Sequence, residues 1–400
     1  MIKDNLYSIE PLLPSEPVPA EISELAHAVV KASLACSGLA HPQVLAGIAP
    51  LLQAMNSYYT NKIEGQHTLP ADIERALAND YDADPDLARR QHLALAHMRT
   101  EAWGKSAWTG RSWRELFSAH ELGAIHQHLY AQISERDRTT ADGDVVTPGA
   151  LRARSVRVGN HVAPDPALLP ELIDRWALGY RAVPDGERAL IALGAAHHRL
   201  TWIHPFRDGN GRAARLHSYL VLIAMGLTNG VWSPLRGLAR RQADYYAHLA
   251  EADAPRRGDT DGRGSLSQAA LCAWIKFWLE ICLDQATFMR GILDLAQMKQ
   301  RIEACVYFLA AQPDSGLRAE AATPLYHVFL TGEIERGEWK RMTGLAERTA
   351  DRLLAACLKQ GLLRSASSKG KVGFGVPLSA LRFYFPRLWP EAEAAADRST

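Results

Sequence analysis

The 400-residue sequence lacks an apolar run long enough to cross a membrane. Its most apolar stretch, Leu216–Leu227, is well short of the about 20 residues that a spanning helix needs. The first 14 residues contain no apolar core of the kind that follows the charges of a secretion signal. The five cysteines form no CxxC pair and no disulfide-like spacing, which is typical of a reducing compartment. We therefore expect a cytoplasmic protein without membrane contact.

The sequence also lacks an excess of either charge. Its 45 Lys and Arg residues against 44 Asp and Glu give a net charge of +1, which argues against a basic nucleic-acid coat but leaves room for a local basic patch. No GxxxxGK[ST] segment and no HRD or DFG pair is present, so a P-loop enzyme and a protein kinase are both disfavoured. With 47% hydrophobic and 22% charged residues, an ordinary globular protein of two or three domains is predicted.

Helical periodicity is the dominant pattern that is present. Apolar residues at three- and four-residue steps, such as Leu45, Ile48 and Leu52, predict a helix over 43–63 that ends at Gly65. Further helices are predicted over 70–78, 87–103, 112–133, 166–181, 186–202, 211–226, 239–251 and 265–310. Period-two alternation over 149–161 predicts one short β-hairpin. The expected fold class is all-α with this hairpin and a different carboxyl-terminal domain.

Composition shifts divide the chain into four predicted segments. A helical region over 1–110 would precede a catalytic domain over 111–260, a helical linker over 261–311 and a last domain over 312–400. In the last domain, segments 338–342, 345–360 and 365–375 read as helix, helix and β-wing, with Thr343-Gly344 as the turn. That order resembles a winged helix, a fold used both for DNA contact and for protein docking.

The stretch Ile203–Arg212 concentrates the chemistry of the sequence. His204 titrates near neutral pH and is the natural general base, and Pro205 stops the preceding helix so that His204 would lie on a loop. Asp208 supplies a hard oxygen ligand suited to Mg²⁺.

Glycines and arginines complete an anion site beside the histidine. Gly209 and Gly211 permit backbone conformations that let amides converge on phosphates, and Asn210 can donate to an α-phosphate oxygen. Arg212 and Arg215 are neighbours on the first turn of the next helix, where they repel each other unless an anion lies between them. The pattern therefore predicts a polyphosphate site at a helix amino terminus.

This segment resembles the HPFx(D/E)GNGRxxR motif of the Fic (filamentation induced by cAMP) family. The resemblance covers about residues 43–255 and implies a protein adenylyltransferase, which moves AMP from ATP to a Ser, Thr or Tyr hydroxyl of a target protein. It implies His204 as the base, Mg²⁺ as the metal, and Arg212 and Arg215 as holders of the β- and γ-phosphates.

A second match lies upstream, where Thr60, Glu64 and Gly65 follow the family's inhibitory pattern (S/T)xxxE(G/N). A glutamate in the last turn of a helix is unfavourable unless it finds a cation. The resemblance implies that Glu64 pairs with Arg215 and so excludes the γ-phosphate of ATP.

The resemblance also implies two further contacts. Residues Val156, Arg157, Val158 and Gly159 would form a flap that binds the target as an added strand. Tyr246 and Leu249 would line the adenine pocket, whereas Tyr245 is expected in the core. Asp253 stands where the family often has Asn, so an adenine contact there is not expected.

Alternatives remain open from the sequence. The donor could be another nucleotide, the reaction could run in reverse, or the domain could be vestigial in a DNA-binding regulator. A metal site of His197, His198 and His204 is disfavoured because no HExxH or third-ligand spacing accompanies them. Three further partners stay open: the chain itself as a target of modification, a second copy in a homodimer, and DNA bound by the last domain.

Overall fold

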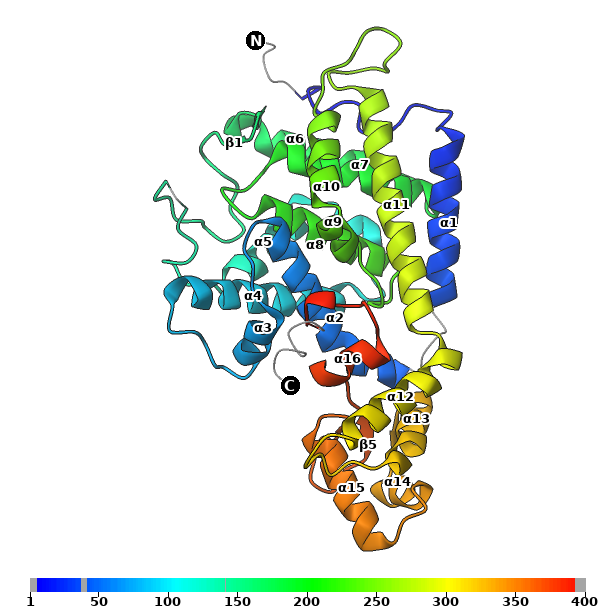
Figure 1. The fold of residues 1–400 in the computed structure, drawn as a ribbon. Coiled ribbons are helices and arrows are strands. Elements are labelled where there is room, and N and C mark those ends of the chain that lie inside the picture. The colour runs from blue at the N-terminus through cyan, green and yellow to red at the C-terminus, as the bar shows by residue number, and fades with distance from the viewer. Residues whose placement is uncertain (1–5, 37–41, 141, 393–400) are drawn as a thin grey trace. The chain divides into compact units, whose positions relative to one another are not determined.

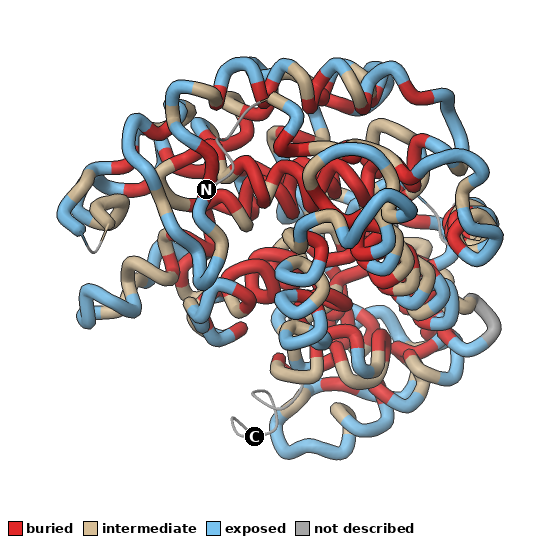
Figure 2. Tube along the Cα trace, turned by 90° about the horizontal axis from the view of Figure 1, so that it is seen from above, coloured by how far each residue is buried: buried red, intermediate tan, exposed pale blue. Residues whose placement is uncertain are grey.

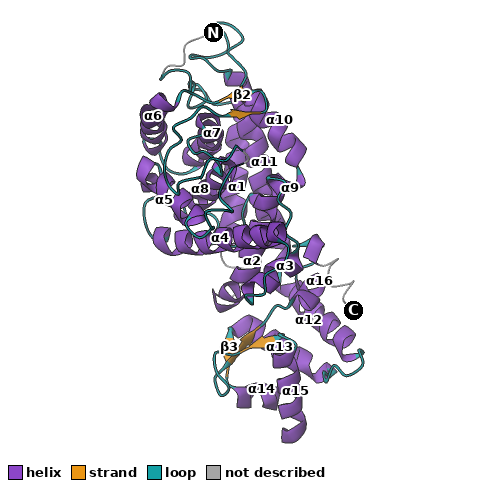
Figure 3. Ribbon diagram, turned by 90° about the vertical axis from the view of Figure 1, so that its left-hand side faces the viewer, coloured by secondary structure: helices purple, strands orange, loops and turns teal. Residues whose placement is uncertain are grey.

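The protein is described by a computed structural model that covers residues 6–36, 42–140 and 142–392. Helices dominate, and strands occur in two small groups, drawn in orange in Figure 3. Most helices are buried along one side and exposed along the other, as Figure 2 shows. No helix among the described residues is both long and apolar enough to cross a membrane. The predicted, mostly helical fold class is confirmed.

The chain divides into two compact units. The first contains Met1–Leu34, Asn56–Thr68 and Asp72–Thr287, and the second contains Ala35–Met55, Leu69–Ala71 and Phe288–Thr400. The four segments drawn from the sequence remain a prediction.

The first unit carries the predicted motif (Figure 1). Its elements are most of α1 (Ala20–Cys36), the later part of α2 (Pro42–Ile63), most of α3 (Pro70–Leu77), α4 (Pro85–Trp108), the 3₁₀-helix η1 (Trp113–Leu116), α5 (Ala119–Tyr130), β1 (Arg157–Val158), β2 (His161–Val162), η2 (Pro166–Leu168), α6 (Leu169–Arg181), α7 (Glu187–Ile203), α8 (Asn210–Ala224), α9 (Leu235–Arg240), α10 (Gln242–Ala252) and most of α11 (Gln268–Ile292). The helix α8, which is buried from Arg212 to Leu222, packs against α4, α5 and α7, and α10 runs beside α11 (Figures 1 and 3).

The second unit contains α12 (Leu295–Ala310), η3 (Ala319–Ala321), α13 (Ala322–Thr331), β3 (Glu333–Ile334), α14 (Arg336–Met342), α15 (Glu347–Lys359), β4 (Leu363–Arg364), β5 (Val372–Phe374) and α16 (Leu378–Tyr384). The three strands form an antiparallel sheet in the order β3-β5-β4. Trp339 of α14, Leu353 of α15 and Phe374 of β5 are all buried.

The predicted helix over 43–63 is α2, and its end explains the position of Glu64. The amide of Gly65 donates to the carbonyl of Lys62 and the amide of Gln66 donates to the carbonyl of Asn61. This pair of bonds is a Schellman motif, which requires a positive φ that Gly65 supplies at 71°. Glu64 is therefore fixed as the last residue before the chain turns.

Several predicted boundaries were wrong. The helix expected over 112–133 is broken into η1 and α5, with Ser118 capping α5 through the amide of Glu121. The helix expected over 265–310 is two helices separated at residues 293–294, and α1 was not predicted at all. The hairpin expected over 149–161 has strands only at 157–158 and 161–162. Residues 149–156 form no strand, and Arg152 among them bonds the carbonyls of His204 and Pro205 after α7.

Candidate active site

His204 lies at the turn between α7 and α8, as the sequence predicted. It follows the last residue of α7 with a left-handed backbone, φ 51° and ψ 61°, and its amide still donates to the carbonyl of Leu200. A non-glycine residue pays about 1–2 kcal/mol for this conformation, so the surroundings must hold it there. The left-handed turn directs the chain away from α7 and starts the loop that leads into α8.

The imidazole of His204 is prepared to accept a proton. Its Nδ1 lies 3.3 Å from the carbonyl oxygen of Thr201 and donates to it, which leaves the Nε2 lone pair available. Burial lowers the pKa of His204 to about 4, so the ring is neutral at pH 7. A neutral, oriented imidazole meets the requirement for a general base.

Arg152 holds the backbone of this loop in place. Its Nε donates to the carbonyl of His204 at 2.8 Å, and its backbone amide donates to the carbonyl of Pro205 at 2.9 Å. A second guanidinium nitrogen donates to the carbonyl of Pro164 at 2.6 Å. Arg152 precedes β1 and Pro164 follows β2. The buried guanidinium thereby joins the histidine loop to both ends of the β1–β2 hairpin.

Asn210 closes the loop from the other side. Its Oδ1 accepts from the amide of Phe206 and its Nδ2 donates to the carbonyl of Phe206, both at 2.8 Å. One hydrogen of Nδ2 and the oxygen are thus used within the loop, and the predicted bond from Asn210 to an α-phosphate stays a prediction. The Phe206 ring is stacked on His126 at 3.9 Å between ring centroids.

Asp208 and Arg212 are joined through a tyrosine that the sequence did not point to. The hydroxyl of Tyr130 donates to Asp208 Oδ2 at 2.8 Å and accepts from Arg212 Nη2 at 2.7 Å, and the same nitrogen lies 3.3 Å from Asp208. Burial raises the pKa of Asp208, but the Arg212 guanidinium and the Tyr130 hydroxyl outweigh it and the pKa lies below its usual value. Asp208 is therefore a carboxylate, with its side chain 45% exposed.

Arg212 has donor capacity to spare. Its side chain is 4% exposed, yet Nε and Nη1 have no hydrogen-bond partner within the described residues. Next to it on α4, His97 is fully buried with both ring nitrogens unpartnered, and burial with the neighbouring arginines lowers its pKa to about 3. A buried guanidinium with two idle donors is suited to an incoming anion.

Arg215 is already occupied by the predicted inhibitory residues. Its Nη2 lies 2.5 Å from Glu64 Oε1 and donates to the carbonyl of Thr60 at 3.2 Å, while its Nε donates to Thr60 Oγ1 at 2.9 Å. The Arg215 side chain is 1% exposed and that of Glu64 30%. Burial lowers the pKa of Arg215, but the Glu64 carboxylate more than restores it.

The glycines of the motif permit the close approach of two side chains. A Cβ on Gly211 would collide with the Glu64 carboxylate and lie 2.9 Å from Arg215 Nη1. Gly209 has φ 74°, and a Cβ there would collide with the Tyr130 ring. Glu64 therefore occupies the space over the amino terminus of α8, where phosphates are predicted to bind.

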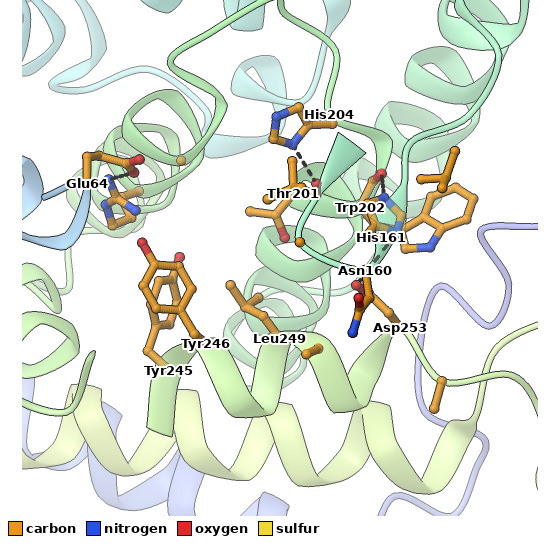
Figure 4. A pocket seen from close by; sticks show the side chains of 17 residues that line it. Glu64, Asn160, His161, Thr201, Trp202, His204, Tyr245, Tyr246, Leu249 and Asp253 are labelled. Atoms are coloured by element: carbon orange, nitrogen blue, oxygen red, sulfur yellow. Dashed lines mark hydrogen bonds and ion pairs between the residues drawn. The ribbon is translucent and has the colours of Figure 1, made fainter. Parts of the chain in front are cut away.

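A cavity of about 680 Å³ opens beside this contact (Figure 4). Its walls include Glu64, His204, Arg215, Tyr246 and Leu249, which join the predicted base, inhibitory and adenine-pocket residues. Tyr245 is 1% exposed, as expected of a core residue, although its edge also reaches the cavity wall.

Tyr246 has a second contact that links the cavity to α2. Its hydroxyl donates to the carbonyl of Ile63 at 2.7 Å, and Gln242 Nε2 donates to the same oxygen at 3.0 Å. Both donors come from α10 and satisfy the exposed end of α2 next to Glu64.

The far end of the cavity is polar. Asp253 Oδ1 lies 2.9 Å from His198 Nε2, and its Oδ2 lies 3.7 Å from His161 Nδ1. His161 Nε2 bonds the carbonyl of Trp202 at 2.8 Å, which anchors β2 to the end of α7 (Figure 4). His198 is thus engaged with Asp253, and His197 with Ser218 and Tyr245. No cluster of three or more His, Cys, Asp or Glu residues suited to a metal occurs in the described part of the chain.

A second cavity of about 830 Å³ is lined by His204 and Asp208. The predicted flap residues Val156, Arg157 and Val158 line it, and Val158 and His204 line both cavities. Gly159, with φ 59°, forms the tip of the β1–β2 turn. The histidine therefore lines two cavities that both touch the flap, the first shared with Glu64 and Arg215 and the second with Asp208.

The functional residues that the sequence did not identify are Tyr130, His126, Arg152, His161 and Gln242. Arg152 and His161 fall within the predicted hairpin segment, but no motif distinguishes them. Tyr130 and His126 come from α5, about 80 residues before the loop they contact.

Comparison with known proteins agrees with this geometry. A match to the Fic/DOC family covers residues 116–222. A protein adenylyltransferase Fic from Nematostella vectensis is 25% identical over 224 residues, which are 52% of this chain and 46% of the relative. A protein adenylyltransferase fic-1 from Caenorhabditis briggsae is 35% identical over 202 residues, 49% of this chain and 36% of the relative. The match therefore spans less than half the length of either relative.

The fold is also similar to that of a solved structure. A Fic family protein from Desulfovibrio desulfuricans G20 superposes with a TM-score of 0.54 at 18% identity, covering 91% of this chain and 98% of that one. At that identity the likeness concerns the fold alone. The HPFRDGNGR loop between α7 and α8 lies inside the region that matches the Fic/DOC family.

Proposed function

We propose that this protein is an adenylyltransferase that moves AMP from ATP to a Ser, Thr or Tyr hydroxyl of a target protein. The observation that carries the proposal is the position of His204, neutral and oriented, in the walls of two cavities that the flap also lines, one with Glu64 and Arg215 and the other with Asp208. The relatives named as protein adenylyltransferases support the same chemistry.

In the proposed reaction the target hydroxyl lies next to His204 and the flap. Its oxygen forms a bond to the α-phosphorus, the bond from that phosphorus to the bridging oxygen breaks, and pyrophosphate leaves. The hydroxyl proton passes to His204 Nε2, which is free because Nδ1 faces the Thr201 carbonyl. Arg152 keeps the histidine in this orientation through the loop backbone.

Residues of α8 and its preceding loop would bind the triphosphate. Arg212 offers two unpartnered buried donors, and the amino-terminal amides of α8 add their dipole. Arg215 would bind the γ-phosphate once the Glu64 carboxylate no longer pairs with it. Tyr246 and Leu249 would hold the adenine in the 680 Å³ cavity.

Asp208 fits Mg²⁺, the metal that the family resemblance implies. It is an ionised, partly exposed carboxylate, and the described residues place no cluster of three or more His, Cys, Asp or Glu ligands there, which suits an ion that takes its other ligands from phosphates and water. Bound there, Mg²⁺ would neutralise charge on the phosphates, and Tyr130 and Arg212 would fix the orientation of the carboxylate.

The contact of Glu64 with Arg215 supports autoinhibition. The carboxylate is fixed by the Schellman turn at Gly65 and by the bonds of Tyr246 and Gln242 to Ile63. It fills the space over Gly211 and would block the γ-phosphate without touching His204.

Several finer points belong to the same proposal. We propose a winged helix in the second unit, supported by the order of helix, strand, two helices and two strands. A cytoplasmic location is supported by the absence of disulfides among the five cysteines, all of which are described. Self-modification and a homodimer remain proposals from the sequence, as do the four predicted segments.

The test is incubation of the full chain with α-labelled ATP, Mg²⁺ and a cell lysate. Wild type, Glu64→Gly and the double variant with His204→Ala are compared for label on lysate proteins and on the chain itself. We expect label with Glu64→Gly and none with the double variant. If UTP or GTP labels proteins in preference to ATP, that nucleotide and not ATP is the donor. If no nucleotide is transferred, the proposal is refuted.

A further inference from the structure

The second unit presents a basic stripe on one helix. The face of α15 that packs inward consists of Ala350, Leu353, Leu354 and Cys357. At 100° per residue, Arg348, Arg352 and Lys359 lie on the opposite side, and all three are exposed. Their spacings of 4 and 7 residues keep them in one row about 16 Å long.

The acidic residues of α15 do not cancel this row. Glu347 and Asp351 lie on its flank, and Lys340 of α14 pairs with both, at 3.8 Å and 2.9 Å. Among the described residues, Arg348, Arg352 and Lys359 have no acidic partner within 4.0 Å. Over residues 336–387 the chain has eleven Lys or Arg against three Asp or Glu, although its overall net charge is only +1. The positive charge is therefore concentrated here.

A loop between β4 and β5 adds another cation. Arg336 ties this loop to the start of α14, because its Nε donates to the carbonyl of Gly370 at 2.9 Å and its Nη2 to that of Ser367 at 3.1 Å. Lys369 stands exposed at the tip of the loop so held.

We propose that the α15 stripe and the β4–β5 loop bind double-stranded DNA. A straight helix whose outer face carries cations, with only the small Ala355 between Arg352 and Lys359, can enter a major groove about 12 Å wide and reach phosphates on both sides. The deep, narrow major groove of duplex RNA would not admit it. An acidic protein could match the charge, but a uniform row of cations without an apolar centre is typical of a phosphate-binding surface rather than a protein-docking one.

The test uses the full chain and a fluorescent 30-base-pair duplex of mixed sequence, with anisotropy measured from 50 to 300 mM salt. Four cations on phosphates predict a slope of log K against log salt of about −3.6, and Arg348→Ala/Arg352→Ala should reduce it to about −1.8. That loss corresponds to an affinity at least tenfold weaker at 50 mM salt. Arg348→Lys/Arg352→Lys, which keeps the charge, should retain the slope.

The matched control is Lys31→Ala/Arg181→Ala, which removes two exposed cations from the first unit and should leave binding unchanged. Lys359→Ala/Lys369→Ala repeats the test if the first pair lowers the melting temperature. Absence of binding at 50 mM salt, equal loss in the control, or tighter binding to poly-glutamate than to the duplex would overturn the proposal. Binding should persist in His204→Ala, so this result is independent of AMP transfer.

Discussion

Replacing Glu64 by glycine is expected to raise the rate of AMP transfer by about 10- to 100-fold. The substitution removes the carboxylate that occupies Arg215 and the space over Gly211. It leaves His204, Asp208 and the phosphate-binding amides intact.

The magnitude follows from the geometry of the pair. Breaking a fully buried ion pair costs about 3–5 kcal/mol, but the Glu64 side chain is 30% exposed, so solvent screens part of the attraction. We therefore take the free energy of the Glu64–Arg215 pair that ATP must replace as about 1.4–2.7 kcal/mol, which corresponds to a rate difference of one to two factors of ten. Arg215 should stay in place, because Thr60 still accepts two of its hydrogen bonds.

The assay is initial-rate transfer of labelled AMP to the chain itself and to lysate, at several ATP concentrations. Glu64→Gln is the matched variant, since it keeps the size and an acceptor oxygen but loses the charge, and its rate should fall between the two. Arg215→Ala also breaks the pair but should gain little, because the γ-phosphate loses its own partner. Wild-type and Glu64→Gly rates that agree at every ATP concentration would refute autoinhibition by this residue.

Three further predictions concern the loop and the buried histidines. In the Glu64→Gly background, His204→Ala should lower transfer by about 10²–10⁴-fold with ATP binding retained. With His204 intact, the transfer rate of Glu64→Gly should fall on acidification only near pH 4, and a fall near pH 6.5 would contradict the buried, neutral ring. Asp208→Ala should abolish the Mg²⁺ dependence of transfer and Arg212→Ala should weaken ATP binding, whereas Tyr130→Phe should raise the Mg²⁺ concentration needed; unchanged titrations of all three would contradict this site. Burial lowers the pKa of five histidines to about 3 or 4 in the folded protein, so they leave the free energy of unfolding at its full value above pH 6.5. Below that pH the free energy of unfolding should fall by up to about 1.4 kcal/mol per pH unit for each histidine, because the unfolded chain binds the protons first. Urea unfolding at several pH values measures this decrease. The five are His97, His126, His197, His204 and His217.

Local patterns in the sequence predicted the features that depend on neighbours in the chain. The 43–63 helix, its glycine end and the loop at Pro205 all follow from spacing, capping and the restrictions of proline. The break in the helix expected over 265–310 was missed because no proline interrupts the apolar repeat between Ile292 and Leu295. The helix α1 was missed because Ala26 and Ser33 supply part of its buried face, which weakens the contrast between its sides.

Contacts between distant segments could be predicted only where a known motif joined them. The pairing of Glu64 with Arg215, 151 residues apart, was expected from the resemblance and not from either residue alone. Tyr130 had no such motif, and a tyrosine at the end of an amphipathic helix is usually a core residue. Its role between Asp208 and Arg212 depends on how α5 packs on α8, which periodicity does not specify.

Arg152 illustrates why an arginine's role is hidden when it acts on backbone. Its partners are carbonyl groups, which every residue carries, so no side-chain pattern in the sequence marks them. Yet the left-handed conformation of His204 needs an external hold, and the Arg152 bonds to His204 and Pro205 provide it. The same guanidinium bonds Pro164, just after β2, so the position of the base and the position of the flap are set by one side chain. A segment that reads as a plain hairpin therefore also aligns the two sides of the proposed reaction.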